Sequence, residues 1–188
     1  NILYVDEANL LQDDVVDALL DAAAQGSYTV RHSTLAATYW SRFLLIGSMN
    51  PEEGRLRPQI QDRFGLRLMV SGLTDAAERL EAYRRVRAYQ ANRRQLIAQF
   101  AAETDLARQE IQEARRLLPQ VQLAEEVARQ GLALVDRLKI DSLRAEITLF
   151  EAARAYAAAD ARTQVELQDL RRVALMALRL RRSDFRTQ

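Results

Sequence analysis

Two short apolar runs near the start of the chain constrain its fold more than any other feature. Residues 2–5 and 43–50 are continuous stretches of mainly apolar residues, each about as long as a strand and each leading into polar side chains. Continuous runs, as opposed to alternating ones, are typical of strands that are buried on both faces of a parallel sheet. The sequence therefore predicts two buried parallel strands and an α/β core.

The remainder of the chain changes from a mixed pattern to a purely helical one. In the first part, the patterns predict a helix at 13–24 that Gly26 ends, two short strands or a hairpin at 27–43, a short helix at 56–64 and a third strand at 66–70. Beyond residue 74, apolar residues recur every three or four positions, which predicts helices at 75–100, 103–118, 124–138, 143–158 and 165–182. Thr163 and Glu166 match a capping box for the last of these helices. We therefore expect a partial α/β core at residues 1–72 and an all-helical part at 73–188.

Composition narrows the class of protein. With 27 basic and 26 acidic residues, the net charge is +1, so no overall field favours nucleic acid or an acidic membrane surface. The absence of cysteine excludes disulfides and thiolate metal sites, and no apolar run approaches the roughly 20 residues of a membrane span. We expect a cytoplasmic protein without a membrane span. Because the chain begins at Asn1 and not at Met, we also expect it to be a piece of a longer protein.

The first apolar run leads directly into Asp6 and Glu7. Two adjacent carboxylates at the mouth of a sheet are unfavourable unless a cation or a reacting water uses them. The pair is therefore a candidate metal and base site. The same pattern also begins ordinary loops, and Asp is a good helix N-cap, so the pattern alone does not decide.

Three further polar residues follow in an informative order. Asn50 ends the second apolar run, Arg63 closes the short helix after it, and Arg144 begins a helix in the helical part. Together with the acidic pair, this order resembles the Walker B, sensor 1, arginine finger and sensor 2 positions of the AAA+ ATPases. More narrowly, the chain is similar to the AAA+ subunits of magnesium chelatase, of either the I-type or the D-type, in three stretches: residues 3–11, 47–54 and 56–66.

The resemblance implies the C-terminal part of a AAA+ core followed by a helical lid domain, with ATP and Mg²⁺ as cofactors. Asp6 would hold the Mg²⁺ of ATP, and Glu7 would orient and deprotonate the attacking water. Asn50 would hydrogen-bond that water or the γ-phosphate. Arg63 would act on the ATP of a neighbouring subunit, and Arg144 would contact a phosphate at a helix N-terminus.

Each of these roles has a local alternative. Asn50 is also a common residue at the start of a loop before proline, and Arg144 is also a common surface residue. Arg63 could instead pair on the surface with Asp62 or Glu53, and Arg57 is a rival for the finger.

Two features depart from the family pattern. The glycine-rich loop GxxxxGK[S/T] that cradles phosphates is absent, and Lys139, the only lysine, lies in a helical stretch. We therefore expect this chain by itself not to hydrolyse ATP. The segment 27–42 has also diverged, and we expect its His32 to lie on the surface, because no second histidine exists to share a metal.

Three functions from different classes agree with the sequence. The first is the ATPase motor of a magnesium chelatase, in which a ring of AAA+ subunits drives Mg²⁺ insertion into protoporphyrin IX, for chlorophyll or bacteriochlorophyll biosynthesis, together with a large porphyrin-binding subunit. The second is a structural ring module that supplies Arg63 but hydrolyses nothing. The third is a MoxR-like or nucleic-acid remodelling ATPase, which is suggested by two groups of arginines. These arginines lie among acidic residues at helical spacing, an arrangement that is more typical of a solvated helix face. They are Arg84, Arg85, Arg87, Arg93, Arg94, Arg179, Arg181, Arg182 and Arg186.

Overall fold

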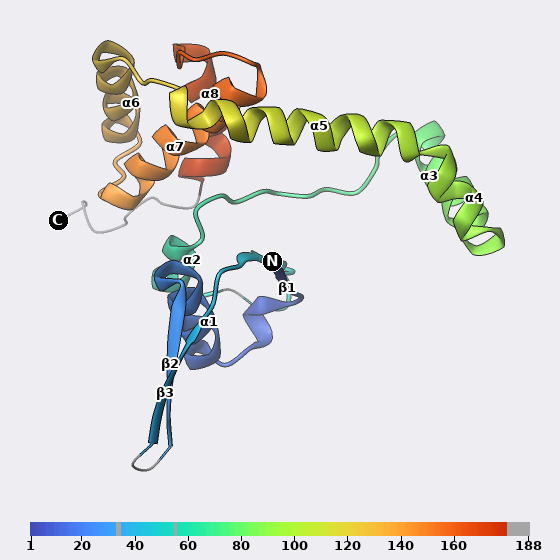
Figure 1. Ribbon diagram of the computed structural model, residues 1–188, viewed down its shortest axis with the longest axis horizontal. Coiled ribbons are helices and arrows are strands. Elements are labelled where there is room, and N and C mark those ends of the chain that lie inside the picture. The colour runs from blue at the N-terminus through green and yellow to red at the C-terminus, as the bar shows by residue number, and fades with distance from the viewer. Residues whose placement is uncertain (33–34, 55, 180–188) are drawn as a thin grey trace. The chain divides into compact units, whose positions relative to one another are not determined.

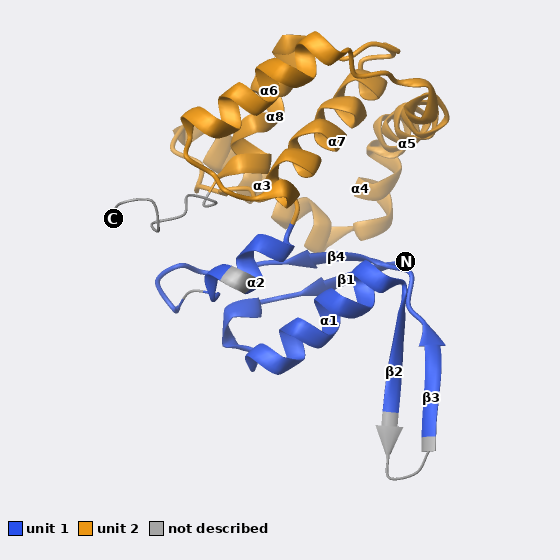
Figure 2. Cartoon of the chain, turned by 90° about the vertical axis from the view of Figure 1, so that its left-hand side faces the viewer, with its two compact units in different colours: residues 1–64 blue, residues 65–188 orange. Residues whose placement is uncertain are grey.

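The computed structural model describes residues 1–32, 35–54 and 56–179 (Figure 1). The chain divides into two compact units, Asn1–Phe64 and Gly65–Gln188 (Figure 2). The first unit is mixed α/β and the second is helical, which confirms the predicted fold class. The boundary between the AAA+ core and the helical part that we predict after residue 72 stays a prediction.

The first unit is built on a parallel pair of strands, β1 (Ile2–Val5) and β4 (Leu44–Gly47). Val5 pairs with Gly47 at the carboxyl ends of the strands. Between the two strands run a 3₁₀ turn, a helix and an antiparallel hairpin: η1 (Ala8–Leu10), α1 (Asp13–Gln25), β2 (Ser27–His32) and β3 (Leu35–Trp40). A short helix, α2 (Pro58–Arg63), closes the unit. The predicted parallel pair, hairpin and helices are therefore confirmed.

Helix α1 ends where the sequence predicts. Gly26 adopts a left-handed conformation with φ of 68°, and its N–H bonds to the carbonyl of Ala22. Glycine adopts this conformation without the steric cost that a Cβ brings. The hairpin follows at once, and Figure 2 shows it extending away from β1 and β4.

A small apolar cluster holds α1 to α2. Val16, Leu20, Leu56 and Ile60 are buried there, and the side chains of Leu45, Met49 and Phe64 pack against them. This cluster fixes the two helices relative to each other and to the start of the segment after β4.

The prediction that β1 and β4 are buried strands is wrong for this chain. Ile2 is 70% exposed, and Tyr4, Leu44 and Ile46 are also exposed. Among the described residues the sheet has only these two strands, so little covers its faces. Continuous apolar runs show that a strand is suited to burial, but the burial itself depends on neighbouring strands and helices.

The predicted third strand at residues 66–70 is also wrong. These residues have no regular secondary structure, and Leu68, Met69 and Val70 are exposed. A strand is stable only when its backbone groups pair with a neighbour. In the described part of the chain, no strand pairs with this segment.

The second unit consists of helices joined by short connections. Its elements are α3 (Ala76–Ala91), α4 (Arg93–Gln99), α5 (Ala101–Leu117), η2 (Leu118–Gln120), α6 (Glu125–Arg137), α7 (Leu143–Ala159) and α8 (Leu167–Leu178). The single helix predicted at 75–100 breaks at Asn92, whose side chain accepts a hydrogen bond from the Gln95 N–H at 3.1 Å. Asn competes in this way with the helical hydrogen bond of its own segment. None of these described helices is long and apolar enough to cross a membrane.

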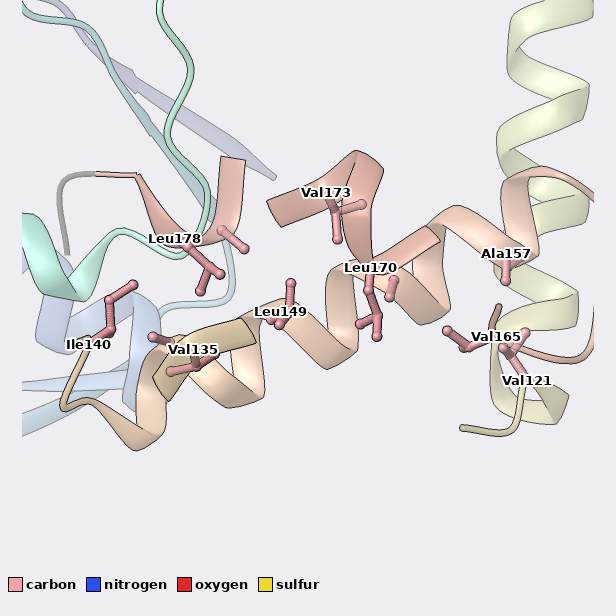
Figure 3. Close-up of a cluster of buried hydrophobic side chains, with 13 residues drawn as sticks. Val121, Val135, Ile140, Leu149, Ala157, Val165, Leu170, Val173 and Leu178 are labelled. Carbon is pink, nitrogen blue, oxygen red and sulfur yellow. The ribbon is translucent and has the colours of Figure 1, made fainter. Parts of the chain in front are cut away.

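The main core lies between α6, α7 and α8 (Figure 3). Ala145, Leu149, Ala153 and Ala157 are fully buried and recur every four residues on one face of α7. Small alanine side chains let neighbouring helices approach closely, and Leu149 supplies apolar bulk between them. Facing side chains complete the core: Val121, Val135, Ile140, Val165, Leu170, Val173 and Leu178.

One charged pair is built into this core. Asp169 is fully buried, and both of its oxygens accept hydrogen bonds from Arg162, at 2.6 and 2.8 Å. Asp169 also accepts from the N–H of Glu166, which caps α8. The predicted capping box of Thr163 and Glu166 is therefore wrong, because the box consists of Glu166 and Asp169. Asp169 serves the cap and the ion pair together, a role that local spacing does not reveal.

Candidate functional site

The parallel pairing of β1 and β4 brings Asp6 and Ser48 together. Each of these residues directly follows its strand, and the strands end side by side at the pair Val5 and Gly47. The Ser48 hydroxyl donates to Oδ1 of Asp6, and the Tyr4 hydroxyl donates to the same oxygen at 3.0 Å. Our sequence predictions did not include Ser48 or Tyr4, although the position of Ser48 after the second parallel strand was a usable signal.

These hydroxyls favour the ionised form of Asp6. The hydrogen bond from Ser48, followed by that from Tyr4, lowers the pKa of the Asp6 carboxyl, and the small opposing effect of desolvation does not overcome them. Hydroxyl donors favour the charged form of a carboxyl because they bond most strongly to it. Asp6 is therefore an exposed, negatively charged oxygen ligand at neutral pH.

Replacing Ser48 with alanine is expected to raise the pKa of Asp6 towards its ordinary value, because the largest cause of the lowering is removed. The shift can be measured by carbon-detected NMR titration of the Asp6 carboxyl. Ser41→Ala is the matched control, since the Ser41 hydroxyl bonds to the Ala22 carbonyl and not to Asp6. An Asp6 pKa that is the same in Ser48→Ala as in the wild type would contradict this origin of the shift.

Glu7 has an unusual backbone. Its φ of 49° and ψ of 48° lie in the left-handed region, which side chains with a Cβ seldom adopt. Its N–H bonds to the Ser48 hydroxyl oxygen at 3.3 Å, and its carbonyl accepts the N–H of Leu10 at 2.9 Å. Strained conformations held in place by such bonds are concentrated at functional sites. The backbone of Glu7, an exposed residue next to Asp6 in the sequence, is therefore fixed by these bonds.

The residues present fit a magnesium ion that is carried by a nucleotide. No cluster of three or more His, Cys, Asp or Glu residues that could hold a metal occurs in the residues that the structure describes. Mg²⁺ does not need one, because it commonly binds one or two carboxylates together with phosphate oxygens and waters. The ionised oxygen of Asp6 satisfies that requirement.

Asn50 forms a local turn. Its side-chain oxygen accepts the N–H of Glu52 at 3.2 Å, and its carbonyl accepts the N–H of Glu53 at 3.1 Å. The structure therefore gives Asn50 the loop-starting role that we weighed as an alternative. A second role towards the attacking water stays a prediction.

Arg63 pairs with helix α1. Its Nη1 atom bonds to Asp21 and lies 3.8 Å from Oδ1 of Asp17. The alternative partners Asp62 and Glu53 are thus replaced by two acids of the neighbouring helix. Arg57, the rival for the finger, pairs with Asp13 through both Nε and Nη2.

Arg144 belongs to the second unit, and the structure describes its environment there. It is the second residue of α7 and lies two positions after the N-cap Ser142, whose hydroxyl accepts the N–H of Ala145 at 3.3 Å. Arg144 is exposed at the N-terminus of a 17-residue helix. This position suits contact with an anion, and the contact itself stays a prediction.

Two of the arginines that suggested nucleic acid, Arg85 and Arg93, have partners nearby in the chain. Arg85 pairs with Glu81 at 2.9 Å and lies over the ring of Phe100, and Arg93 lies over the ring of Tyr89. This arrangement favours a solvated helix face. Arg181, Arg182, Arg186, Ser33, Thr34 and the side chain of His32 lie outside the described residues.

Comparisons with known proteins find similar chains. The family model for the AAA lid domain matches residues 133–188. A magnesium-chelatase subunit ChlI homolog from Methanocaldococcus jannaschii is 41% identical over 187 residues, covering 98% of this chain and 51% of the relative. The magnesium-chelatase 38 kDa subunit of Acidiphilium rubrum is 45% identical over 179 residues, covering 95% of this chain and 52% of the relative. Residues 133–188 therefore match a AAA lid domain, and nearly the whole chain is similar to magnesium-chelatase subunits.

The chain spans about half the length of these relatives. The crystal structure of a candidate ATPase from Cytophaga hutchinsonii has the same fold, with a TM-score of 0.69 at 24% identity, covering 96% of this chain and 58% of that one. The predicted AAA+ core followed by a helical lid is therefore confirmed.

Proposed function

We propose that this AAA+ chain is the half of a magnesium-chelatase subunit that carries the metal-binding and base residues for ATP hydrolysis. The observation that carries the proposal is the ionised Asp6 beside the strained Glu7 at the carboxyl end of a parallel strand. The similarity to magnesium-chelatase subunits also supports this proposal. The full protein would use ATP and Mg²⁺ to drive Mg²⁺ insertion into protoporphyrin IX, together with a large porphyrin-binding subunit. A cytoplasmic location stays a prediction.

Different residues of this chain would have different roles in phosphoryl transfer. Asp6 would hold the Mg²⁺ that neutralises phosphate charge, and Glu7 would accept the proton of the attacking water. Asn50 would orient that water. Arg63 would stabilise the charge of the phosphoryl group bound by a neighbouring subunit, and Arg144 would contact a phosphate. Because the phosphate-binding loop is absent from this sequence, we propose that the chain by itself does not hydrolyse ATP.

An arginine that acts on a neighbour implies a ring. A head-to-tail contact uses different surfaces on the two subunits, and it closes on itself only when the subunits form a ring. The exposed position of Arg63 at the end of α2 is compatible with such a contact.

The proposal is tested with the full-length protein and a purified porphyrin-binding subunit. Magnesium insertion is followed by the change in protoporphyrin IX fluorescence, and ATP hydrolysis is followed in parallel. We expect insertion only with hydrolysable ATP. Binding of ATP without hydrolysis would identify the supporting ring module instead, and stimulation of hydrolysis by DNA at low salt would favour the remodelling ATPase.

Mixing two inactive variants is expected to restore activity. A Glu7→Gln subunit still offers Arg63, and an Arg63→Ala subunit still offers Glu7, so one kind of interface in a mixed ring is complete. For random assembly at equal amounts, about a quarter of the interfaces are complete, so about a quarter of the wild-type ATPase rate is expected. The rate is measured over a series of mixing ratios. No recovery at any ratio would contradict the use of Arg63 across an interface.

A further inference from the structure

Helix α1 presents a row of three aspartates to the two arginines that flank α2. Asp13, Asp17 and Asp21 are spaced four residues apart, so they lie along one face of the helix. Arg57, the N-cap residue of α2, pairs with Asp13, while Arg63, the last residue of α2, pairs with Asp21 and Asp17. The two ends of α2 are therefore tied to α1 by separate ion pairs.

The two arginines are held in different ways. Arg57 uses both Nε and Nη2 on a single oxygen of Asp13, and this hydrogen bonding raises its pKa. Arg63 uses only Nη1, and both of its carboxylate contacts are made by that atom. Among the described residues, neither Nε nor Nη2 of Arg63 bonds to a carboxylate. The guanidinium of Arg63 is thus anchored at one nitrogen, and its other donors stay available for an anion.

The aspartates that bind Arg63 lie on a helix that is held in place by packing against α2. Val16 and Leu20 of α1 are buried against Ile60 of α2, at 3%, 7% and 2% exposure. Asp17 and Asp21 are adjacent in sequence to these core positions, so their backbone is held by the same packing. Exposed ion pairs such as these add little stability, so their main effect is on the orientation of the arginine.

We propose that Asp21, assisted by Asp17, is a positioning residue that orients Arg63 towards the phosphoryl group of ATP bound by a neighbouring subunit. This inference rests on the proposed function. It also selects Arg63 over Arg57, because Arg57 is bound at both Nε and Nη2. Asp21 itself touches neither ATP nor water and acts only through Arg63.

The test is steady-state ATP hydrolysis by full-length Asp21→Asn. We expect kcat to fall about two- to five-fold, since an exposed ion pair of this kind is weak, while KM for ATP is unchanged. Asp21→Glu keeps the charge and should recover part of the lost rate. Asp13→Asn is the matched control, because it releases Arg57 from the same helix, and its kcat should equal that of the wild type. Thermal unfolding of each variant checks that the fold is intact.

The outcomes separate this inference from the proposed function. Arg63→Ala should lower kcat by about 10³-fold or more, and adding Asp21→Asn should lower it no further. If Arg63→Ala has the wild-type rate, that result contradicts both the role of Arg63 as the finger and the role of Asp21 in positioning it. If Arg63→Ala is impaired but Asp21→Asn is not, only the positioning role is overturned. An equal loss in Asp13→Asn and Asp21→Asn would also overturn it, because that result indicates general loosening of α1 against α2.

Discussion

A Glu7→Gln variant of the full-length protein is expected to bind ATP like the wild type and to hydrolyse it about 10²- to 10⁴-fold more slowly. Glutamine keeps the size and hydrogen-bonding shape of the side chain but cannot accept the proton of the attacking water. Asp6 is unchanged, so binding of the magnesium nucleotide is retained. Binding is measured with a fluorescent ATP analogue, and hydrolysis is measured by release of inorganic phosphate.

Asp14→Asn is the matched control for this variant. Asp14 is an exposed acid in the first turn of α1, and its carboxylate accepts the N–H of Val15 at 3.0 Å. Asparagine can keep that bond, so wild-type hydrolysis is expected. Undiminished hydrolysis by Glu7→Gln would show that Glu7 is not the base.

Replacing Asp169 with alanine is expected to lower the free energy of unfolding by about 3–5 kcal/mol. The change leaves the Arg162 guanidinium without its bidentate partner and the N–H of Glu166 without its acceptor. Breaking a buried ion pair on one side costs more than the pair contributes, because the other charge loses its closest partner, and here Arg162 keeps the more exposed Asp160 and Glu166 at 3.2 and 3.8 Å. Urea denaturation of the full-length protein, followed by helical circular dichroism, measures the loss.

Asp160→Ala is the control for Asp169. Asp160 contacts the same arginine, at 3.2 Å, but its side chain is 51% exposed. Exposed ion pairs contribute at most about 1 kcal/mol. Equal destabilisation by the two variants would contradict the special role of the buried carboxyl.

The same pair predicts how stability depends on pH. Burial raises the pKa of Asp169, but the hydrogen bonds from Arg162 and from the Glu166 N–H outweigh it, so the net pKa is lowered. A carboxyl with a lowered folded-state pKa contributes stability above its unfolded pKa, about 3.9, and loses it as the pH falls through the folded value. Asp169→Ala should therefore weaken the dependence of unfolding on pH in the acidic range below about 4.

Local patterns in the sequence predicted most of the secondary structure. The helix that ends at Gly26 and the short helix with Pro58 at its start follow from residues that are close together in the chain. The strand at 66–70 and the N-cap at Thr163 were predicted wrongly, because a strand needs a distant partner and because the cap consists of Glu166 and Asp169, which also binds Arg162.

The sequence by itself determined the order of the acidic pair, Asn50, Arg63 and Arg144, and with it the resemblance to the AAA+ ATPases. Only the tertiary structure decided which groups these residues meet: Ser48 and Tyr4 on Asp6, and Asp21 and Asp17 on Arg63. The physical reason is the distance along the chain. Ser48 lies 42 residues from Asp6, and Arg63 lies 42 residues from Asp21, so strand pairing and helix packing bring them together, and no local pattern records either contact.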